Sequence, residues 1–289
     1  MFQLFANIFG YLLNIINNLV NNYGLAIILF TVLIKLIMLP LSIKQQKTMK
    51  KSAKLQEQMK VLQFKYKNDP EKLNREMMDL YKKENMSPFS GCLSAILQII
   101  LLFSIFYMVR SPLTYMEKID KTQIDSYVQQ IKDSGKTVSQ AYSEIDIIRE
   151  IEYLRNNNPE DVTLQKVNLN MNFLGLDLSK IPQQNLNDWT VYIIPILYII
   201  STFFSMKLTT SMQKNNDDKK ELTDGNSNEN ERNEMEDAMA QSNKMMSWMM
   251  PIMSVSISLV APLGLALYWL INNILMICER LVLNKIIKD

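Results

Sequence analysis

The sequence predicts an all-α membrane protein with five transmembrane helices and a cytoplasmic helical hairpin. Its 289 residues are 48% hydrophobic, yet the mean hydropathy is only −0.04, because the charged side chains fall almost wholly outside a few long apolar runs. These runs approach the roughly 20 residues that a helix needs to cross about 30 Å of hydrocarbon. The Lys and Arg side chains are also spread unevenly over the intervening segments, as expected of a multi-pass protein with a fixed orientation.

The composition argues against several kinds of chemistry. The 31 basic and 29 acidic side chains leave a net charge of +2, so no overall positive field would attract nucleic acid. The chain has no His, and its two Cys, Cys92 and Cys278, are too few for a zinc ribbon or a disulfide framework. We therefore expect no enzymatic activity, no metal site, no cofactor and no sequence-specific binding of nucleic acid.

Five apolar segments are expected to cross the membrane. The last two are separated only by the turn-like pair Ala261-Pro262. The five predicted transmembrane helices cover residues 23–43, 91–110, 189–206, 245–261 and 262–278.

The basic residues predict the orientation of these helices. Residues 44–90 carry twelve Lys and Arg against six acids, whereas residues 113–188 carry eight against twelve. The positive-inside rule then places the first segment in the cytoplasm and the second outside, with the N-terminus outside and the tail, residues 279–289, inside. Residues 207–244 must be cytoplasmic although they carry six bases and nine acids. Acidic residues contribute little to the rule.

Residues 1–22 predict an amphipathic helix that lies in the outer interface. The segment is apolar, with Asn7, Asn14, Asn18 and Asn21 at successive spacings of seven, four and three. A cleaved signal peptide is the alternative, although the usual positive region and small-residue cleavage site are missing.

Residues 44–90 predict a basic hairpin of two amphipathic helices. Apolar residues recur at helical spacing before and after Asn68-Asp69-Pro70, where a cap precedes a proline at the first helical position. A solvated positive loop would explain the charges, but it would not explain the apolar stripe. The stripe consists of Leu55, Met59, Leu62 and Tyr66 on the first helix and Leu73, Met77 and Leu80 on the second.

Two further loops carry less information. The extracytoplasmic loop, residues 111–188, is expected to hold short helices, because Ala141, Ile145, Ile148 and Ile151 mark an apolar face. We find no chemistry in it. The cytoplasmic loop, residues 207–244, is acidic and polar and is expected to be partly disordered.

Lys35 is the one charge in the middle of a predicted span, about 12 Å from its cytoplasmic end at 1.5 Å per residue. A lysine at that depth costs about 2.5 to 3.5 kcal/mol on insertion scales. It could extend to the interface, but helical side chains lean toward the helix N-terminus, which here is the opposite direction. Every other predicted span also carries a polar stripe, although Ser and Thr often bond only their own helix. Together the stripes favour a polar cavity that holds water. In the order of the five predicted spans, the stripes are Thr31, Lys35 and Ser42; Ser94 and Gln98; Tyr198, Ser201, Ser205 and Thr209; Ser247, Ser254 and Ser258; and Tyr268, Asn272 and Glu279.

Four runs of the sequence resemble the YidC membrane-protein insertase family. They are ILFTVLIKLIMLPLSIKQQK (28–47), YKNDPEKLNREMMDLYKKENMSPFSGCLSAILQ (66–98), NFLGLDLS (172–179) and MMSWMMPIMSVSISLVAPLGLALYWLINN (245–273). The resemblance implies a bundle of five transmembrane helices around a hydrophilic groove in the inner-leaflet half, open to the cytoplasm and to lipid. It also implies a membrane protein insertase and chaperone, which admits the polar translocated segment of a client and releases its apolar segment laterally to lipid.

The resemblance suggests roles for individual residues and partners. The expected partners are nascent membrane proteins, the ribosome, the secretory translocon and membrane lipid, at a bacterial plasma membrane. The expected lining of the substrate groove is Lys35, Thr31, Gln98, Ser201, Ser205, Asn272 and Trp269. The residues expected to recruit the client or the ribosome are Lys50, Lys54, Leu55, Met59, Leu62, Leu73, Met77 and Leu80.

The chain departs from the family pattern in three respects. Position 35 is usually Arg, and Lys keeps the charge but loses the planar fork. The sequence resembles the short Gram-positive type without a large extracytoplasmic domain, yet lacks the expected signal sequence with a lipid-accepting Cys. The tail has few basic residues, which makes the hairpin the better candidate for ribosome docking. A small-solute or ion transporter with Lys35 as counter-ion is the main alternative, and an assembly scaffold is a third.

Overall fold

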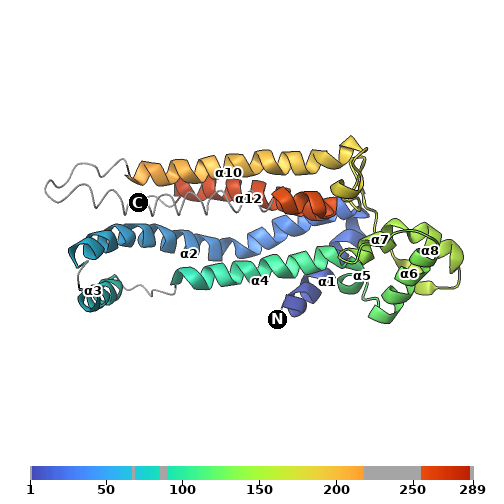
Figure 1. The fold of residues 1–289 in the computed structure, drawn as a ribbon, viewed down its shortest axis with the longest axis horizontal. Coiled ribbons are helices and arrows are strands. Elements are labelled where there is room, and N and C mark those ends of the chain that lie inside the picture. The colour runs from blue at the N-terminus through green and yellow to red at the C-terminus, as the bar shows by residue number, and fades with distance from the viewer. Residues whose placement is uncertain (1, 67–68, 85–89, 218–254, 287–289) are drawn as a thin grey trace.

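The computed structural model describes residues 2–66, 69–84, 90–217 and 255–286, and this part of the chain is mostly helical. Long helices lie side by side along the long axis, with a cluster of short helices at one end and α3 at the other (Figure 1). We call these the cap end and the hairpin end, and we call residues 111–188 the cap. The long helices are α2 (Tyr23–Lys65), α4 (Ser90–Arg110), α10 (Ile193–Asp217) and α12 (Leu263–Ile286).

Three segments are long and apolar enough to cross a membrane, among the residues that the structure describes: Tyr23–Thr48, Trp189–Leu208 and Leu263–Ile286. In α4, the apolar stretch Ile99–Arg110 is shorter. Most of the predicted span 245–261 lies outside the described residues, although residues 255–260 are helical. The structure therefore supports a helical protein with several apolar helices, and the count of five spans stays a prediction.

Helix α2 joins the first predicted span to the first helix of the predicted hairpin. It begins at a cap in which the Asn22 side chain accepts from the Leu25 N–H at 3.0 Å, and it runs on through Pro40 for 43 residues. It therefore does not end at Ile43, where the charges begin. The turn that follows has the predicted chemistry: the Asp69 side chain accepts from the Lys72 N–H at 3.0 Å and Pro70 opens α3 (Pro70–Lys83).

Helix α1 (Phe2–Val20) packs against α4 and α2. The helix also passes close to the residues that follow α4, because a Cβ added at Gly10 would clash with the Tyr115 carbonyl oxygen. Its opposite face exposes apolar side chains, among them Leu4, Ile8 and Leu19. Asn14 and Asn17 hydrogen-bond with cap carbonyls, those of Met116 and Asn168. The placement of α1 in the lipid interface stays a prediction.

The cap contains the predicted short helices and a small sheet. Ile145 and Ile148 are buried and Ile151 is half-buried, whereas Ala141 precedes the helices and is exposed. The two strands are antiparallel, with Asn172 opposite Asp177, and the turn between them has positive φ at Leu174 and Gly175. The cap elements are α5 (Pro112–Tyr115), α6 (Lys121–Asp133), α7 (Ser143–Arg149), α8 (Ile151–Asn157), α9 (Val162–Lys166), β1 (Asn172–Phe173), β2 (Leu176–Asp177) and η1 (Pro182–Gln184); η2 (Trp189–Tyr192) then leads into α10.

Backbone carbonyls of the cap cover the first turns of two long helices. The N–H of Tyr23 donates to the carbonyl of Asn170 at 3.0 Å, and those of Leu263 and Gly264 donate to the carbonyls of Lys180 and Leu178 at 2.9 and 3.0 Å. The first N–H groups of a helix have no partner within the helix, so these contacts satisfy groups that would otherwise be orphaned. The cap therefore closes the ends of α2 and α12.

The buried residues gather at the cap end of the bundle. On α2, Tyr23, Ala26, Ile27, Phe30 and Thr31 are buried, whereas beyond Thr31 the described side chains are half-buried or exposed as far as Leu55. On α12 every residue from Leu263 to Tyr268 is buried, and burial becomes intermittent after Leu270. Packing is thus dense beside the cap and sparser toward the hairpin end.

Candidate functional site

Lys35 forms an ion pair between two long helices. Its Nζ lies 3.4 Å from Oε2 of Glu279 on α12, and the exposed fractions of the two side chains are 25% and 15%. At 1.5 Å per residue, Lys35 lies about 18 Å along α2 from Tyr23, and Glu279 about 24 Å along α12 from Leu263. A hydrocarbon layer of about 30 Å that began at these two helix starts would place the pair in the half away from the cap.

A second polar contact joins α12 to α10. The Asn273 side-chain N–H group donates to the hydroxyl oxygens of Ser201 at 2.9 Å and Thr202 at 3.3 Å. Both hydroxyls in turn donate to the carbonyl of Tyr198, at 2.7 and 2.9 Å. Every hydroxyl oxygen in this group therefore both donates and accepts. Trp269 adds an aromatic contact, because its ring centroid lies 6.1 Å from that of Tyr198.

The other predicted lining residues have different environments. Thr31 is buried and donates to the carbonyl of Ile27 at 2.6 Å, so its hydroxyl is bonded within its own helix. Ser205 is buried and Asn272 is half-buried. The side chain of Gln98 lies outside the described residues. The structure thus places Ser201 and Trp269 at the contact between α10 and α12, through Asn273 and Tyr198, respectively. Lys35 of α2 lies beside Glu279, farther along α12.

Sequence reasoning missed two residues of this site. The polar stripes of the sequence include Glu279 but do not identify it as the partner of Lys35, since pairing depends on how far α2 and α12 extend from the cap. The predicted lining includes Asn272 but not its neighbour Asn273. A spacing signal existed, because Asn273 falls on the buried stripe Ala266, Leu270, Asn273 and Ile277, whereas Asn272 does not.

The predicted recruitment stripe belongs to α2 and α3, which contact each other. Leu55 is buried, and the rest of the apolar stripe is half-buried: Met59, Leu62, Leu73, Met77 and Leu80. The Nζ atoms of Lys65 and Lys72 lie 5.3 and 5.2 Å from the ring centroid of Tyr66. The side chains of Lys50 and Lys54 lie outside the described residues. Part of the apolar surface of the stripe is therefore already covered within the protein.

The cap holds two acidic side chains in covered positions. Burial raises the pKa of Glu144 above its ordinary value, although hydrogen bonds from Thr114, Ser111 and Leu113 act in the opposite direction. The two oxygens of Glu144 accept from the Thr114 N–H at 2.9 Å and from its hydroxyl at 2.7 Å. Burial likewise raises the pKa of Asp146. Glu144 thus ties α7 to the first turn of α5.

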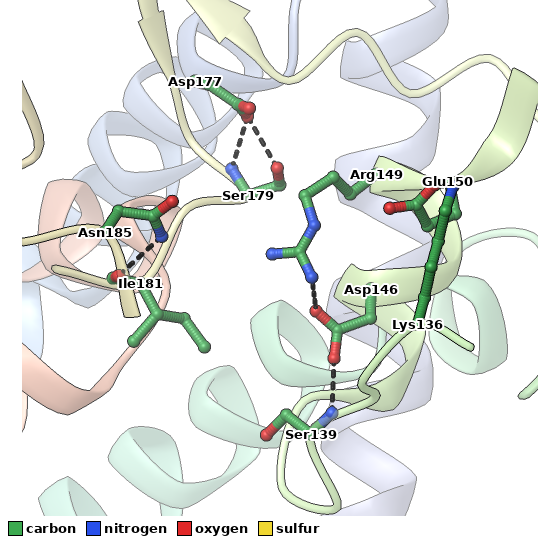
Figure 2. A network of polar contacts seen from close by, with 9 residues as sticks. All are labelled: Lys136, Ser139, Asp146, Arg149, Glu150, Asp177, Ser179, Ile181 and Asn185. Carbon is green, nitrogen blue, oxygen red and sulfur yellow. Dashed lines mark hydrogen bonds and ion pairs between the residues drawn. The ribbon is translucent and has the colours of Figure 1, made fainter. Parts of the chain in front are cut away.

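Figure 2 shows the polar contacts of Asp146 and, beside them, those of the turn at Ser179. Asp146 accepts from the Ser139 N–H at 2.6 Å and pairs with Arg149, whose side chain extends toward the turn at Ser179. In that turn Asp177 accepts from the N–H and hydroxyl of Ser179, at 3.0 and 2.6 Å.

An ion pair holds the chain just before the predicted span 189–206. Lys180 lies 2.8 Å from Asp188, and its hydrogen bond, with those from Thr190, lowers the pKa of Asp188 to about 2. The cap therefore presents ordered polar contacts at this end, and the two cross-helix contacts lie farther toward the hairpin end.

Comparisons with known proteins agree with this architecture. The model of the family described as 60Kd inner membrane protein matches residues 15–289. A membrane protein insertase YidC from Chlorobaculum parvum is 30% identical over 276 residues, which cover 96% of this chain and 35% of the relative. One from Treponema denticola is 27% identical over 279 residues, 96% of this chain and 37% of the relative. One from Fusobacterium nucleatum is 40% identical over 111 residues, 38% of this chain and 54% of the relative.

The chain thus spans about a third of the length of the first of these relatives. The match to the family model nevertheless covers nearly all of it, including every long helix described above. The resemblance seen in the four sequence runs is confirmed, and the chain belongs to the 60Kd inner membrane protein family, the family of the YidC insertases.

Proposed function

We propose that the protein is a non-enzymatic insertase and chaperone for integral membrane proteins. The observation that carries the proposal is the half-buried Lys35–Glu279 pair, which lies in the half of the bundle away from the cap. A charge at that depth is costly unless partners or water surround it. The sparser burial of α2 and α12 on the same side is what a water-containing groove between these helices would require.

The groove would act by shortening the low-dielectric path. Each unpaired polar backbone group costs several kcal/mol in hydrocarbon, so a polar client segment that enters a hydrated groove crosses only part of that barrier. Cap carbonyls on the first turns of α2 and α12 favour a groove that is closed on the cap side. No nucleotide is needed, because burial of the client's apolar segment and the membrane potential supply the driving force.

The apolar part of the client would leave along α10 and α12. The described surface of α10 exposes Ile196, Ile200, Phe203 and Phe204, and α12 exposes Ile274. Such a surface suits a segment that slides into lipid while its polar part is still in the groove. The lining in this proposal is Lys35, Thr31, Gln98, Ser201, Ser205, Asn272 and Trp269, to which the structure adds Glu279 and Asn273 as neighbours.

The orientation that fits this function has the cap outside and the hairpin in the cytoplasm. The cap and α3 lie at opposite ends of the long axis (Figure 1), and the basic residues concentrate at the hairpin end. The basic hairpin would contact nascent membrane proteins, together with the ribosome or the secretory translocon. The membrane is that of a bacterial cell, crossed by five helices with the N-terminus outside.

Reconstitution tests the proposal directly. The purified protein is placed in vesicles of defined phospholipid, and a single-span client with a short polar N-terminal tail is synthesised in their presence. Protection of that tail from added protease, above the level of protein-free vesicles, is the expected result. A protein that protects no client but moves a defined solute would be the transporter, and one that does neither would be a scaffold.

A further inference from the structure

Glu279 offsets the charge of Lys35 before any client arrives. Among the described residues, the Glu279 carboxylate lies 3.4 Å from the Lys35 ammonium group, the cation of the proposed groove that would attract an acidic client group. Arg280 is the next residue and points about 100° away around the helix, although the charge of Glu279 acts on it as well. An acidic client group would therefore meet a cation that already has a partner.

The geometry of the pair suits exchange more than permanent bonding. The 3.4 Å separation is longer than the 2.7 to 2.9 Å of a tight charge-assisted hydrogen bond between an ammonium and a carboxylate. Both side chains also keep part of their surface exposed, at 25% and 15%. A second carboxylate can then approach Lys35 without first dismantling a closely packed pair.

Glu279 has an advantage over any client in this competition. It is attached to α12 beside Lys35, so it competes as an intramolecular group with a high effective concentration. It also repels a client carboxylate and attracts a client ammonium group. Its expected effect is to weaken the preference that Lys35 alone would impose.

We propose that Glu279 is a built-in counter-ion that competes with client carboxylates for Lys35 and so determines which charges the translocated segment can carry. The proposal rests on the insertase function proposed above. Discrimination between acidic and basic client segments then depends on the opposite charges of Lys35 and Glu279 together and not on Lys35 alone. The wild-type protein would then accept segments of either sign, whereas removal of one partner would make it selective.

The test measures one ratio, the yield of inserted client with an acidic tail divided by that of a matched client with a basic tail. Both clients share one apolar segment, and vesicles of zwitterionic phospholipid without a membrane potential remove other sources of charge preference. Glu279→Gln should raise the ratio at least about fivefold, the effect of one unit charge at 4 Å even in bulk water, and Lys35→Gln should lower it by a similar factor. Glu279→Asp, which keeps the charge, is the matched control and should stay near the wild-type ratio.

The exchange variant Lys35→Glu/Glu279→Lys separates this account from one in which only position 35 meets the client. For the exchange variant we expect a ratio of acidic-tail to basic-tail insertion near that of the wild type, because the pair of residues keeps one charge of each sign. A ratio inverted to favour the basic tail would overturn the proposal. An unchanged ratio in Glu279→Gln would also overturn it, and the exchange variant carries the test if Glu279→Gln does not accumulate. A wild-type protein that inserts neither client would instead contradict the proposed function.

Discussion

The side chain of Asn273 on α12 donates a 2.9 Å hydrogen bond to the hydroxyl of Ser201 on α10. This contact joins the two helices along which an apolar client segment is proposed to leave. Asn273 is buried and its amide also reaches Thr202, so the amide is shared between two acceptors of one helix turn. The pairing of α10 with α12 thus includes a polar contact as well as the aromatic contact between Tyr198 and Trp269.

The first prediction concerns the strength of this contact. Asn273→Ala and Ser201→Ala should each destabilise the protein, and their effects should be coupled by about 0.6 kcal/mol, the average for such hydrogen bonds in membranes. Reversible unfolding in mixed detergent micelles measures the four members of the cycle. Additive effects would mean that the two side chains do not interact, and Thr202→Ala in place of Ser201→Ala shows how much coupling the second acceptor carries.

The second prediction concerns pH. Burial raises the pKa of Glu144, so the folded state favours its protonated form. The resulting contribution to stability is complete below the ordinary pKa of a glutamate and is lost as the pH rises through the raised value. Glu144→Gln leaves one amide oxygen in place of two carboxylate oxygens for the Thr114 N–H and hydroxyl. Because the variant also lacks the titrating group, it should destabilise the cap most at about pH 4 and less at pH 7.

Thermal unfolding of the solubilised protein across this pH range provides the measurement. Glu160→Gln, at an exposed position of the cap, is the control and should change little. A destabilisation by Glu144→Gln that grows as the pH rises would contradict a raised pKa of Glu144.

The extent to which these features could be read from the sequence depends on how local their causes are. The turn at Asp69 and Pro70 was predictable because its cap and its proline act within four residues. The end of α2 was not, since the change from apolar to basic residues after Ile43 alters the surroundings of the helix and not its hydrogen bonding. Hydropathy therefore located the span but not the end of the helix.

Pairings between helices were the least accessible to sequence reasoning. Lys35 stood out as a buried charge, but its pairing with Glu279 depends on both helices starting at the cap and running in the same direction. Asn272 and Asn273 differ by about 100° of helix rotation, which decides which of them faces α10. The sequence does not single out Glu144 from the other acids of the cap, because its burial arises from the packing of α7 against α5.

The third prediction concerns the hairpin. Leu62→Ser combined with Leu73→Ser, with every Lys retained, should impair client insertion in cells at an unchanged level of the protein, because both side chains belong to the half-buried stripe. The matched control is Val61→Ser combined with Met78→Ser, since these apolar side chains are 66% and 50% exposed and lie off the stripe. Equal activity of the two double variants would leave the hairpin as a topology signal only.

The fourth prediction is the orientation. In a background without Cys92 and Cys278, single cysteines at Lys54, Ser134 and Asn226 should react with an impermeant thiol reagent from the inside, the outside and the inside of the cell, respectively. Lys54 and Ser134 belong to the basic hairpin and to the cap, which lie at opposite ends of the structure (Figure 1). Labelling of position 226 from outside would exclude the five-span topology.

In the proposed function, the charge of Lys35 admits polar client segments into the membrane. Insertion in cells depleted of their own insertase shows whether this charge is needed. Two clients that differ only in whether the translocated tail is acidic or neutral are expressed with variants at position 35, and the fraction of each tail that reaches the outside is measured. Lys35→Arg should remain active, Lys35→Ala should fail most with the acidic tail, and Lys35→Glu should be worst for that client. Full activity of Lys35→Ala on both clients, at a normal protein level, would contradict the account.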